Sequence, residues 1–271
     1  MDNTLFNLSG KVAVITGGSG TLGTGMAKGL ASAGARIAII GRDGSKAQRV
    51  AESLNAEDAA GFSADVTRRD EIERVAETLL TRWGHVDILV NAAGGNRLDA
   101  ITNPGQTFFD LSPDAMRAVF ELNLMGTILP SQVFGRHMVK TGQGSIINIS
   151  SMAASRPLTR VISYAAAKAG VDNFTRWLAV HLAKEYSPHI RVNAMAPGFF
   201  LAEQNRALLI DGSTGKLTAR GQAIIDHTPM NRFGEAADLI GTLVWLASDA
   251  SAFVTGIVVP VDGGYSAFGG V

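Results

Sequence analysis

The stretch KVAVITGGSGTLG, residues 11–23, decides the fold of this 271-residue chain. Its first half is a short apolar run rich in β-branched residues, which is typical of a buried strand. The glycine-rich turn leads into a helical pattern from about residue 22 to 33, and Gly34 separates that helix from a second strand, ARIAII. A strand, a glycine turn, a helix and a second strand predict a right-handed βαβ unit. The N-terminus of its helix would present free backbone N–H groups, which suit a pyrophosphate.

The same alternation runs along the rest of the chain. Helical patterns near residues 45–54, 70–83, 114–138, 164–186 and 235–247 each precede a strand pattern, in the order AAGFSADV, HVDILVNAAG, GSIINISS, IRVNAMAPG and GIVVPVDGG. Seven strands alternating with helices predict an α/β protein with a Rossmann-type, doubly wound, seven-stranded parallel sheet flanked by helices. No linker interrupts the pattern, so we expect a single domain over residues 1–271.

The polar ends of the predicted strands should share one rim of the sheet, because ligands of doubly wound sheets lie beyond the carboxyl ends of the strands. These ends carry Gly17, Asp65, Asn91, Ser151 and Pro197. A glycine-rich turn is a weak signal when isolated, but here it follows a strand and opens a helix. That context favours nucleotide binding over an ordinary tight turn.

The composition narrows the class of protein. Lys plus Arg and Asp plus Glu number 24 each, so charge gives no argument for a nucleic acid or an acidic membrane surface as partner. The absence of cysteine excludes disulfides and thiolate metal sites, and no ligand cluster surrounds His227, so we expect no metal. The first residues, MDNTLFNLSGK, do not resemble a secretory signal, and no apolar run is long enough to cross a bilayer. We therefore expect a cytoplasmic protein whose partner is a small molecule.

A tyrosine and a lysine four residues apart indicate acid–base chemistry. If residues 164–186 are helical, Tyr164 and Lys168 share one face. The pKa of free tyrosine is about 10, so a neighbouring ammonium is needed to make it an effective base near neutral pH. Ser151 could hold a carbonyl or alcohol oxygen beside the phenol, and its neighbour Ser150 is a second candidate. Taken alone, the pair also fits a surface helix with one aromatic residue on its apolar edge.

Together these features resemble the short-chain dehydrogenase/reductase family, from about residue 9 to the C-terminus. The matching motifs, in the family's order and approximate spacing, are Thr16-Gly17 with the following glycines, Asp65-Val66, Asn91-Ala92-Ala93-Gly94, Asn123, Ser151, Tyr164, Lys168 and Pro197-Gly198. The resemblance implies an NAD(P)-dependent oxidoreductase that interconverts a secondary alcohol and a ketone by hydride transfer. It also implies a homotetramer, assembled through the helices of residues 114–138 and 164–186 and the C-terminal strand.

The resemblance further implies a role for each matching residue. Tyr164 would be the catalytic acid/base, Lys168 would lower its pKa and bind the nicotinamide ribose, and Ser151 would orient the reacting oxygen. Asn123 would hold a water that links Lys168 to solvent in a proton relay. The residues expected to contact the cofactor, from its phosphates and adenine to its nicotinamide, are Gly17, Ser19, Gly20, Thr21, Leu22, Gly23, Arg42, Asp65, Val66, Asn91, Ala92, Gly94, Tyr164, Lys168, Pro197 and Gly198. Taken singly, Asn123 could instead bond to a neighbouring carbonyl, and Asp65 could cap a turn.

The end of the second strand, Gly41-Arg42-Asp43, bears on the choice of cofactor. An arginine there can pair with the 2′-phosphate of NADP, whereas an acid would accept the ribose hydroxyls of NAD. Arg42 therefore favours NADP(H), while Asp43 keeps NAD(H) open.

The chain departs from the family's pattern at two places. Thr21 stands where the family's glycine pattern has glycine, and a β-branched residue disfavours positive φ, so we expect a slightly re-routed turn. Ala202 stands where members often have a threonine that holds the carboxamide of the nicotinamide. We expect backbone groups of residues 199–201 to take over that contact.

Two segments are expected to shape the substrate site. Residues 199–232 are long for a strand-to-helix connection, and we expect short helices that form a lid. The insert after the NAAG motif adds Asn96 and Arg97. The combination NAAGGN, PGFF, QNR, HTPMNRFG and PVDGGYSAFGGV is similar to sugar-acid members of the family, of the D-mannonate oxidoreductase or fructuronate reductase type. A carboxylate suits an arginine fork, for which we favour Arg206, with Arg97 and Arg160 as rivals.

Two other functions stay open at this point. A 3-oxoacyl-thioester reductase, or a general carbonyl reductase, would act on apolar ketones and little on hexuronates. A nucleotide-binding regulatory protein would keep the fold without turnover, although the intact set of Ser, Tyr, Lys and Asn argues against it.

Overall fold

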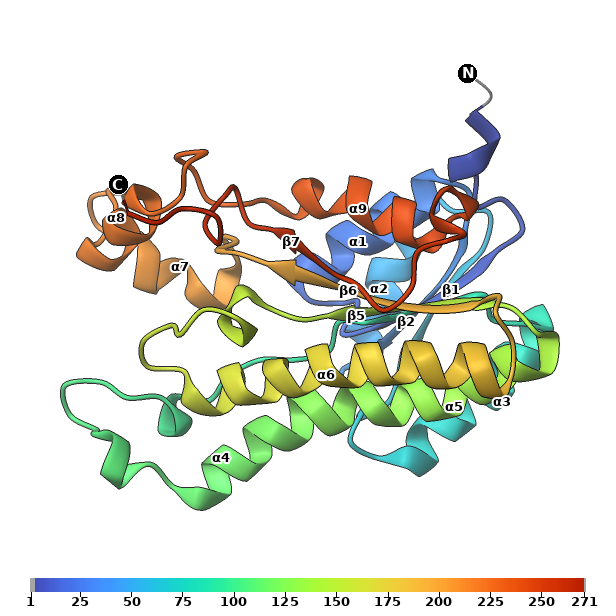
Figure 1. The fold of residues 1–271 in the computed structure, drawn as a ribbon, viewed down its shortest axis with the longest axis horizontal. Coiled ribbons are helices and arrows are strands. Elements are labelled where there is room, and N and C mark those ends of the chain that lie inside the picture. The colour runs from blue at the N-terminus through green and yellow to red at the C-terminus, as the bar shows by residue number, and fades with distance from the viewer. Residues whose placement is uncertain (1–2, 271) are drawn as a thin grey trace.

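One sheet of seven parallel strands forms the centre of the molecule, in the order β3-β2-β1-β4-β5-β6-β7 (Figure 1). The computed structural model describes residues 3–270. The strands are β1 (Val12–Thr16), β2 (Arg36–Gly41), β3 (Ala59–Ser63), β4 (Ile88–Asn91), β5 (Gly144–Ile149), β6 (Ile190–Pro197) and β7 (Val258–Val261). The predicted doubly wound, Rossmann-type sheet is confirmed. The strand order reverses between β1 and β4, where Thr16 pairs with Asn91, so the crevice for a ligand begins at this pair.

Helices cover both faces of the sheet, which is why its strands are almost wholly apolar (Figure 1). One face carries α1 (Thr21–Ser32), α2 (Gly44–Glu52) and α9 (Ile240–Ala247), and the other carries α3 (Arg69–Trp83), α5 (Gly126–Thr141) and α6 (Ile162–Glu185). The remaining helices are α4 (Pro113–Phe120), α7 (Glu203–Leu209) and α8 (Ala219–Asp226). Short 3-10 turns occupy Asn3–Phe6, Leu98–Ala100, Phe108–Asp110, Met152–Ala154, Ala236–Leu239 and Asp249–Ser251.

Two helices differ from the sequence prediction. The continuous helix expected over residues 114–138 is interrupted by a π-helical turn at Glu121–Met125, so α4 and α5 are separate. Asn123 lies in this turn, and π turns are frequent at functional sites. The helix expected over residues 235–247 starts as a 3-10 turn before α9. Apolar spacing predicts a helical face but does not distinguish the hydrogen-bond pattern of each turn.

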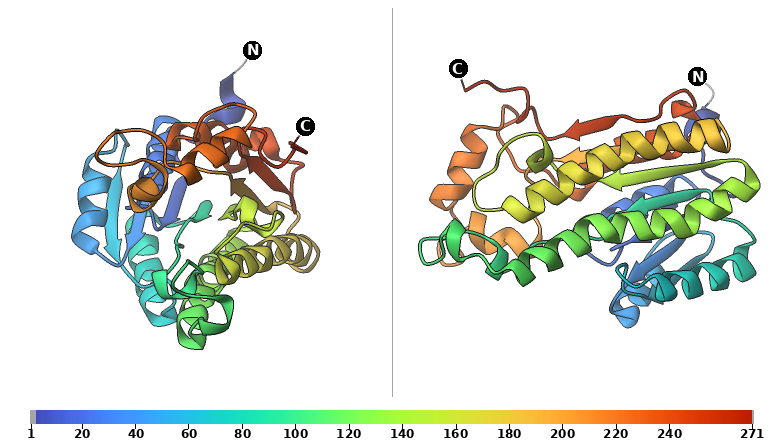
Figure 2. Two further views of the ribbon diagram at one scale, coloured as in Figure 1. Left: turned by 90° about the vertical axis from the view of Figure 1, so that its left-hand side faces the viewer. Right: turned by 60° about the horizontal axis from the view of Figure 1, so that its bottom comes forward.

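The expected lid and the substrate-side loops gather at one end of the molecule. Residues 199–232 contain the short helices α7 and α8, and these lie beside the C-terminal tail beyond the carboxyl ends of the strands (Figures 1 and 2). The insert at residues 95–111 and the segment at 152–161 project from the same end (Figure 2). The loops that can vary therefore surround the predicted rim.

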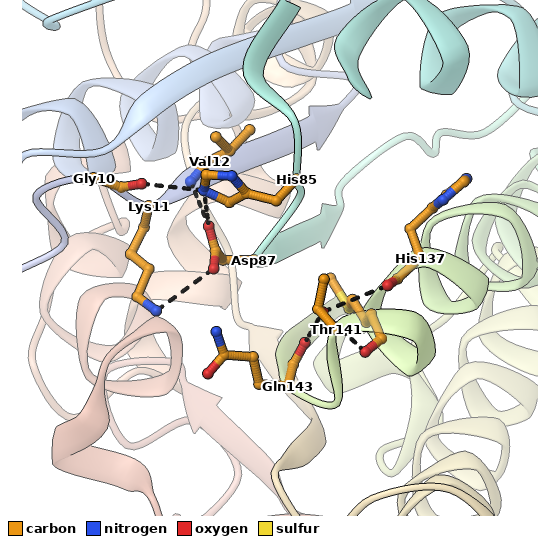
Figure 3. A network of polar contacts seen from close by, with 9 residues as sticks. Gly10, Lys11, Val12, His85, Asp87, His137, Thr141 and Gln143 are labelled. Carbon is orange, nitrogen blue, oxygen red and sulfur yellow. Dashed lines mark hydrogen bonds and ion pairs between the residues drawn. The ribbon is translucent and has the colours of Figure 1, made fainter. Parts of the chain in front are cut away.

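The opposite end of the sheet is closed by polar contacts around Asp87 (Figure 3). Its carboxylate accepts the backbone N–H of Val12 at 2.8 Å and lies 3.5 Å from Nζ of Lys11 and 3.2 Å from Nε2 of His85. These contacts tie the start of β1 to the start of β4. They lie at the far end of the strands from the rim that carries the predicted site.

None of the helices in the described part of the chain combines the length and the hydropathy needed to cross a membrane.

Candidate active site

The glycine turn between β1 and α1 is built for close approach of the backbone. Gly17 has φ 66°, and a β-carbon added there would lie 2.7 Å from Cα of Ala93. A β-carbon at Gly23 would lie 2.3 Å from the carbonyl oxygen of Gly17. Helix α1 begins at Thr21 with Gly20 as its N-cap and no side-chain cap, so its first N–H groups are open to an anion. The turn therefore fits the pyrophosphate of a dinucleotide.

The departure at Thr21 is absorbed by the start of the helix. Thr21 is the first residue of α1, and Gly17 is the residue of this turn that takes positive φ. The extra glycine at position 20 supplies the N-cap. Thr21 thus has ordinary helical backbone, and the turn needs no positive φ at this position.

Tyr164, Lys168 and Ser151 meet where β5 ends beside the first turns of α6. The Nζ atom of Lys168 lies 5.7 Å from the centre of the Tyr164 ring. It donates a hydrogen bond to the carbonyl oxygen of Ile149 at 2.6 Å. The hydroxyl of Ser151 lies beside the phenol and acts to lower its pKa. The structure therefore brings together three of the four residues that we predicted to be catalytic.

The two candidate serines have different surroundings. Ser150 is buried, and its hydroxyl donates to the carboxylate of Asp172. Ser151 is only half-buried and faces Tyr164. Of the two, Ser151 is the serine placed beside the phenol.

Burial has the largest effect on the ionisation of the tyrosine and the lysine. It raises the pKa of Tyr164, and the hydrogen bond with Ser151 acts in the opposite direction. It lowers the pKa of Lys168 to about 8, and the carboxylate of Asp172 opposes that effect. The pKa of Tyr164 is thus raised, where we expected it to be lowered, and the ammonium of Lys168 is hydrogen-bonded to the carbonyl of Ile149.

Asn123 approaches Lys168 from the π turn between α4 and α5. Its side chain accepts the N–H of Gly95 at 3.1 Å and donates to the carbonyl of Gly95 at 2.8 Å. A β-carbon at Gly94 would lie 2.7 Å from Oδ1 of Asn123 and 3.4 Å from Nζ of Lys168. The amide and the ammonium therefore flank the same glycine. The alternative contact of Asn123 with a neighbouring carbonyl, that of Val119, is present as well at 2.8 Å.

A chain of buried amides and hydroxyls crosses the sheet just below the rim. Nδ2 of Asn91 donates to Oγ of Ser131 on α5 and to Oδ1 of Asn148 on β5, both at 2.9 Å. Nδ2 of Asn148 then donates to Oγ1 of Thr175 on α6 at 2.9 Å. The side chain of Asn91 thus points into the core. The cofactor contact expected of residues 91–94 stays a prediction.

The ends of β2 and the glycine turn meet at the far side of the crevice. Oγ of Ser19 would lie 2.8 Å from a β-carbon at Gly41, so Ser19 packs beside the end of β2. Arg42 is exposed. The carboxylate of Asp43 accepts the N–H of Lys46 at 2.9 Å and caps α2. Of the two charged residues at this strand end, Asp43 is engaged by its own helix.

Asp65 caps a turn after β3, as the alternative interpretation of this residue proposed. Its Oδ1 accepts both the N–H and the hydroxyl of Thr67, at 2.9 and 2.8 Å. Val66 is buried, and its Cγ2 would lie 2.8 Å from a β-carbon at Gly126. The adenine contacts expected of Asp65 and Val66 stay predictions.

Gly198 and the residues after it connect β6 to the segment that contains α7 and α8. A β-carbon at Gly198 would lie 2.7 Å from Cβ of Asp262, so the strand end requires glycine. The carbonyl of Phe199 accepts the N–H of Gly234 at 2.9 Å, and the N–H of Leu201 donates to the carbonyl of Gly234 at 3.1 Å. These bonds engage part of the backbone that we expected to replace the missing threonine.

The predicted substrate residues of the NAAG insert are tied to one another. Arg97 forms a two-point contact with Asp99, at 2.9 and 2.7 Å. The side chain of Asn96 accepts the N–H of Arg97 at 3.0 Å. Arg206, on α7, is exposed. The guanidinium of Arg97 is therefore engaged by its own loop.

Arg160 and Arg220 lie near each other, which was not predicted from the sequence. Arg160 has φ 76°, an uncommon backbone conformation for a residue other than glycine. Nη1 of Arg220, on α8, lies 3.5 Å from Oγ1 of Thr159, and burial followed by the charge of Arg160 lowers the pKa of Arg220. Arg220 lines a cavity of about 220 Å³ together with Phe199 and other residues. The distance in sequence between α8 and the loop at 157–160 explains why spacing did not reveal this pair.

A family model described as short chain dehydrogenase matches residues 11–211. The chain belongs to the short-chain dehydrogenase family. An oxidoreductase of Bacillus subtilis (strain 168) described as uncharacterized, UxuB, is 49% identical over 276 residues, which cover 98% of each protein. The family and its oxidoreductase relatives show that this protein is an NAD(P)-dependent oxidoreductase, as predicted.

Two solved structures of family members resemble this one in fold and length. A candidate D-mannonate oxidoreductase from Haemophilus influenza, with bound NAD, is 43% identical with a TM-score of 0.91, and the match covers 98% of each chain. A gluconate 5-dehydrogenase from Burkholderia cenocepacia J2315, in complex with NADP and tartrate, is 33% identical with a TM-score of 0.84 and the same coverage. The predicted resemblance to sugar-acid members of the family is confirmed.

The rim of this short-chain dehydrogenase can therefore supply acid–base chemistry beside a dinucleotide crevice. Among residues 3–270, no group of three or more His, Asp or Glu side chains is placed to hold a metal ion. Asp172, which acts on Lys168, was not predicted. The signal was available, since it continues the four-residue spacing of Tyr164 and Lys168 along α6.

Proposed function

We propose that this protein interconverts a secondary alcohol and a ketone on a sugar acid of the D-mannonate/D-fructuronate type, with Ser151, Tyr164, Lys168 and Asn123 as its catalytic residues. The observation that carries the proposal is the meeting of the first three at the end of β5, with Asn123 and Lys168 flanking Gly94. The nicotinamide cofactor supplies or accepts the hydride when it is bound.

The protein's own groups handle the oxygen and its proton. In the reducing direction, Tyr164 donates a proton to the substrate oxygen while Ser151 holds that oxygen by a hydrogen bond. The ammonium of Lys168 stabilises the phenolate that remains and binds the ribose. Asn123 positions the water through which Lys168 exchanges protons with solvent. These roles are the ones implied by family resemblance, and the observed distances are compatible with them.

A Tyr164→Phe variant tests the mechanism. We expect turnover to fall at least about a hundredfold, which is the usual contribution of a general acid, while NADPH affinity changes little. Turnover is followed by cofactor absorbance, and affinity by cofactor fluorescence. Near-normal turnover with unchanged affinity would contradict the role of the tyrosine.

The sugar-acid substrate is supported by the relatives and by the arginines near the rim. Because Arg97 is engaged by Asp99, we propose that Arg206 on the lid binds the substrate carboxylate, with Asn96 near the same ligand and Arg160 as the rival arginine. Arg206→Gln should raise the KM for D-fructuronate about tenfold or more without raising it for a neutral ketose. If Arg160→Gln has that effect instead, the carboxylate lies on the loop at 157–160.

The choice of substrate also separates this proposal from its alternatives. A 3-oxoacyl-thioester or general carbonyl reductase would reduce apolar ketones and leave hexuronates almost untouched. A regulatory protein would bind NADPH and turn over no alcohol or ketone. A screen of sugar acids, polyols and apolar ketones with both cofactors decides among the three.

For the cofactor we propose a preference for NADP(H), with use of NAD(H) as well. The carboxylate of Asp43 is occupied by the cap of α2, which leaves exposed Arg42 as the charged group at the end of β2. The relatives include one structure with NAD and one with NADP. Arg42→Ala should weaken NADPH binding more than NADH binding, and equal effects on both would contradict the preference.

We also propose a homotetramer, and the cytoplasmic location inferred from the sequence stays a prediction. Support for assembly comes from exposed apolar residues at α6. Trp177 and Val180 on the helix and Tyr186 at its C-cap are each more than half exposed. Light scattering on the purified protein measures the state directly. A Trp177→Glu variant should dissociate the assembly if α6 is one of its contacts.

A further inference from the structure

We propose that Asp172 is a positioning residue for this reaction: its buried carboxylate keeps the ammonium of Lys168 charged and, through Ser150, holds the end of β5 that carries Ser151. The inference rests on the proposed roles of Lys168 and Ser151. Asp172 itself is not a catalytic residue in this proposal, because its carboxylate is hydrogen-bonded to Ser150 and not to the phenol of Tyr164.

Three successive turns of α6 contact three successive residues at the end of β5. Tyr164 meets Ser151, Lys168 donates to the carbonyl of Ile149 at 2.6 Å, and the carboxylate of Asp172 accepts the hydroxyl of Ser150. The four-residue spacing of the helical partners places all of them on one face of α6. The side chains of Tyr164, Lys168 and Asp172 thus fix the position of α6 relative to the end of β5, and charged groups take part in these contacts.

Asp172 is an unusual residue for its place. It is 8% exposed, and the other buried residues of α6 include no acid. A buried carboxylate is costly unless it is paired or hydrogen-bonded. The hydroxyl of Ser150 alone could be accepted by a neutral amide, so the hydrogen bond does not by itself require a charge. The positive charges of Arg176 and Lys168 also favour the charged carboxylate.

Few charged groups act on the ammonium of Lys168 and the carboxylate of Asp172. On α6, Lys168 lies between Tyr164 and Asp172, and exposed Arg176 follows Asp172 one turn later. The β5 end contributes the Ser150 hydroxyl and a carbonyl, and the π turn contributes the neutral amide of Asn123. Burial lowers the pKa of Lys168 to about 8, and within residues 3–270 the opposing charge is that of Asp172. Burial raises the pKa of Asp172, against the Ser150 hydrogen bond and the charges of Arg176 and Lys168.

An Asp172→Asn variant removes the charge and keeps an acceptor for Ser150. The measurement is NADPH affinity by cofactor fluorescence between about pH 6 and 10, together with the pH profile of kcat/KM for D-fructuronate. In the wild type both should decline as Lys168 loses its proton. In Asp172→Asn the midpoint of that decline should move to lower pH by about one unit, the size expected for loss of one nearby charge.

Two variants serve as matched controls. Ser150→Ala breaks the hydrogen bond and keeps the charge, and Arg176→Gln removes an exposed charge from the same helix face, where solvent screens it. Both should leave the midpoint within a few tenths of a pH unit of the wild type. An unchanged midpoint in Asp172→Asn would overturn the inference. An equal shift in Ser150→Ala would overturn it as well, since the effect would then come from strand position.

Failure of the proposed function has a different signature. If Lys168→Met bound NADPH with the pH dependence of the wild type, Lys168 would not contact the cofactor. The charge of Lys168 would then be followed through the pH dependence of the free energy of unfolding in urea. That measurement needs no ligand. The stability of Asp172→Asn should begin to rise with pH about one unit earlier than that of the wild type, and coincident pH profiles would overturn the role of Asp172.

Discussion

Replacing Lys168 with methionine should abolish a rise in stability that the wild type shows between about pH 8 and 10.5. Folding lowers the lysine's pKa from 10.5 to about 8 by burial. At about 1.36 kcal/mol per unit, the buried ammonium costs the folded state about 3 kcal/mol when it is charged. The side chain is 4% exposed, so solvent screens little of this cost.

The sign of the pH dependence follows from the lowered pKa. Below about pH 8 the lysine is charged in the folded and the unfolded chain alike, so the cost is complete. Between about pH 8 and 10.5 the folded chain gives up its proton first, so the stability of the wild type rises with pH relative to the variant. The free energy of unfolding of the wild type should therefore rise by about 2 to 3 kcal/mol relative to that of Lys168→Met between pH 7 and pH 10.

Urea unfolding of both proteins at these two pH values, at one fixed protein concentration, measures the difference. Loss of the hydrogen bond to Ile149 affects the variant at both pH values, and the comparison between them removes most of it. Lys184→Met is the control, since Lys184 is exposed on the same helix. If the wild type and Lys168→Met showed parallel pH dependence, the argument that burial depresses this lysine would be refuted.

Three further substitutions probe other parts of the site. Asn148→Ala should lower the free energy of unfolding by about 3 kcal/mol, because it leaves buried partners without hydrogen bonds, and a loss below about 1 kcal/mol in urea would contradict the network. Gly94→Ala should reduce kcat/KM at least about tenfold by displacing the amide of Asn123, whereas Gly95→Ala, with no atom within 4 Å of the added carbon, should not. Gly23→Ala should abolish NADPH binding measured by fluorescence, and retained affinity would show that the turn tolerates a side chain.

The parts of the fold that depend on apolar periodicity were predictable from the sequence. Seven apolar runs alternating with helical patterns gave the sheet and its parallel order, since few connections satisfy that alternation. The π turn at Glu121–Met125 was not predictable in this way, because it keeps the same apolar face as the helix expected there. Within this turn, the side chain of Asn123 bonds to the backbone of Gly95, which belongs to another segment.

The nearness of Tyr164 and Lys168 was predictable for a similar reason, and the surroundings of the candidate site were not. Tyr164 and Lys168 are neighbours on one helix, so spacing alone places them together. The inward orientation of Asn91 and the engagement of Arg97 by Asp99 depend on where rotamers find hydrogen-bond partners. The nearness of Arg220 to residues 159–160 depends on how the lid folds back, which local sequence does not record.

The gathering of the insert, the loop at 152–161 and the two lid helices at one end of the strands has an evolutionary consequence (Figure 2). These segments add little to the two apolar cores, whereas the reacting groups are fixed by β5, α6 and the π turn. The segments that we propose to contact the substrate and the residues that we propose to react therefore lie on separate parts of the chain. Replacing residues 199–232 with those of a relative should therefore change the substrate range and leave the type of reaction unaltered. In this way one fold can acquire new substrates while it keeps its reaction.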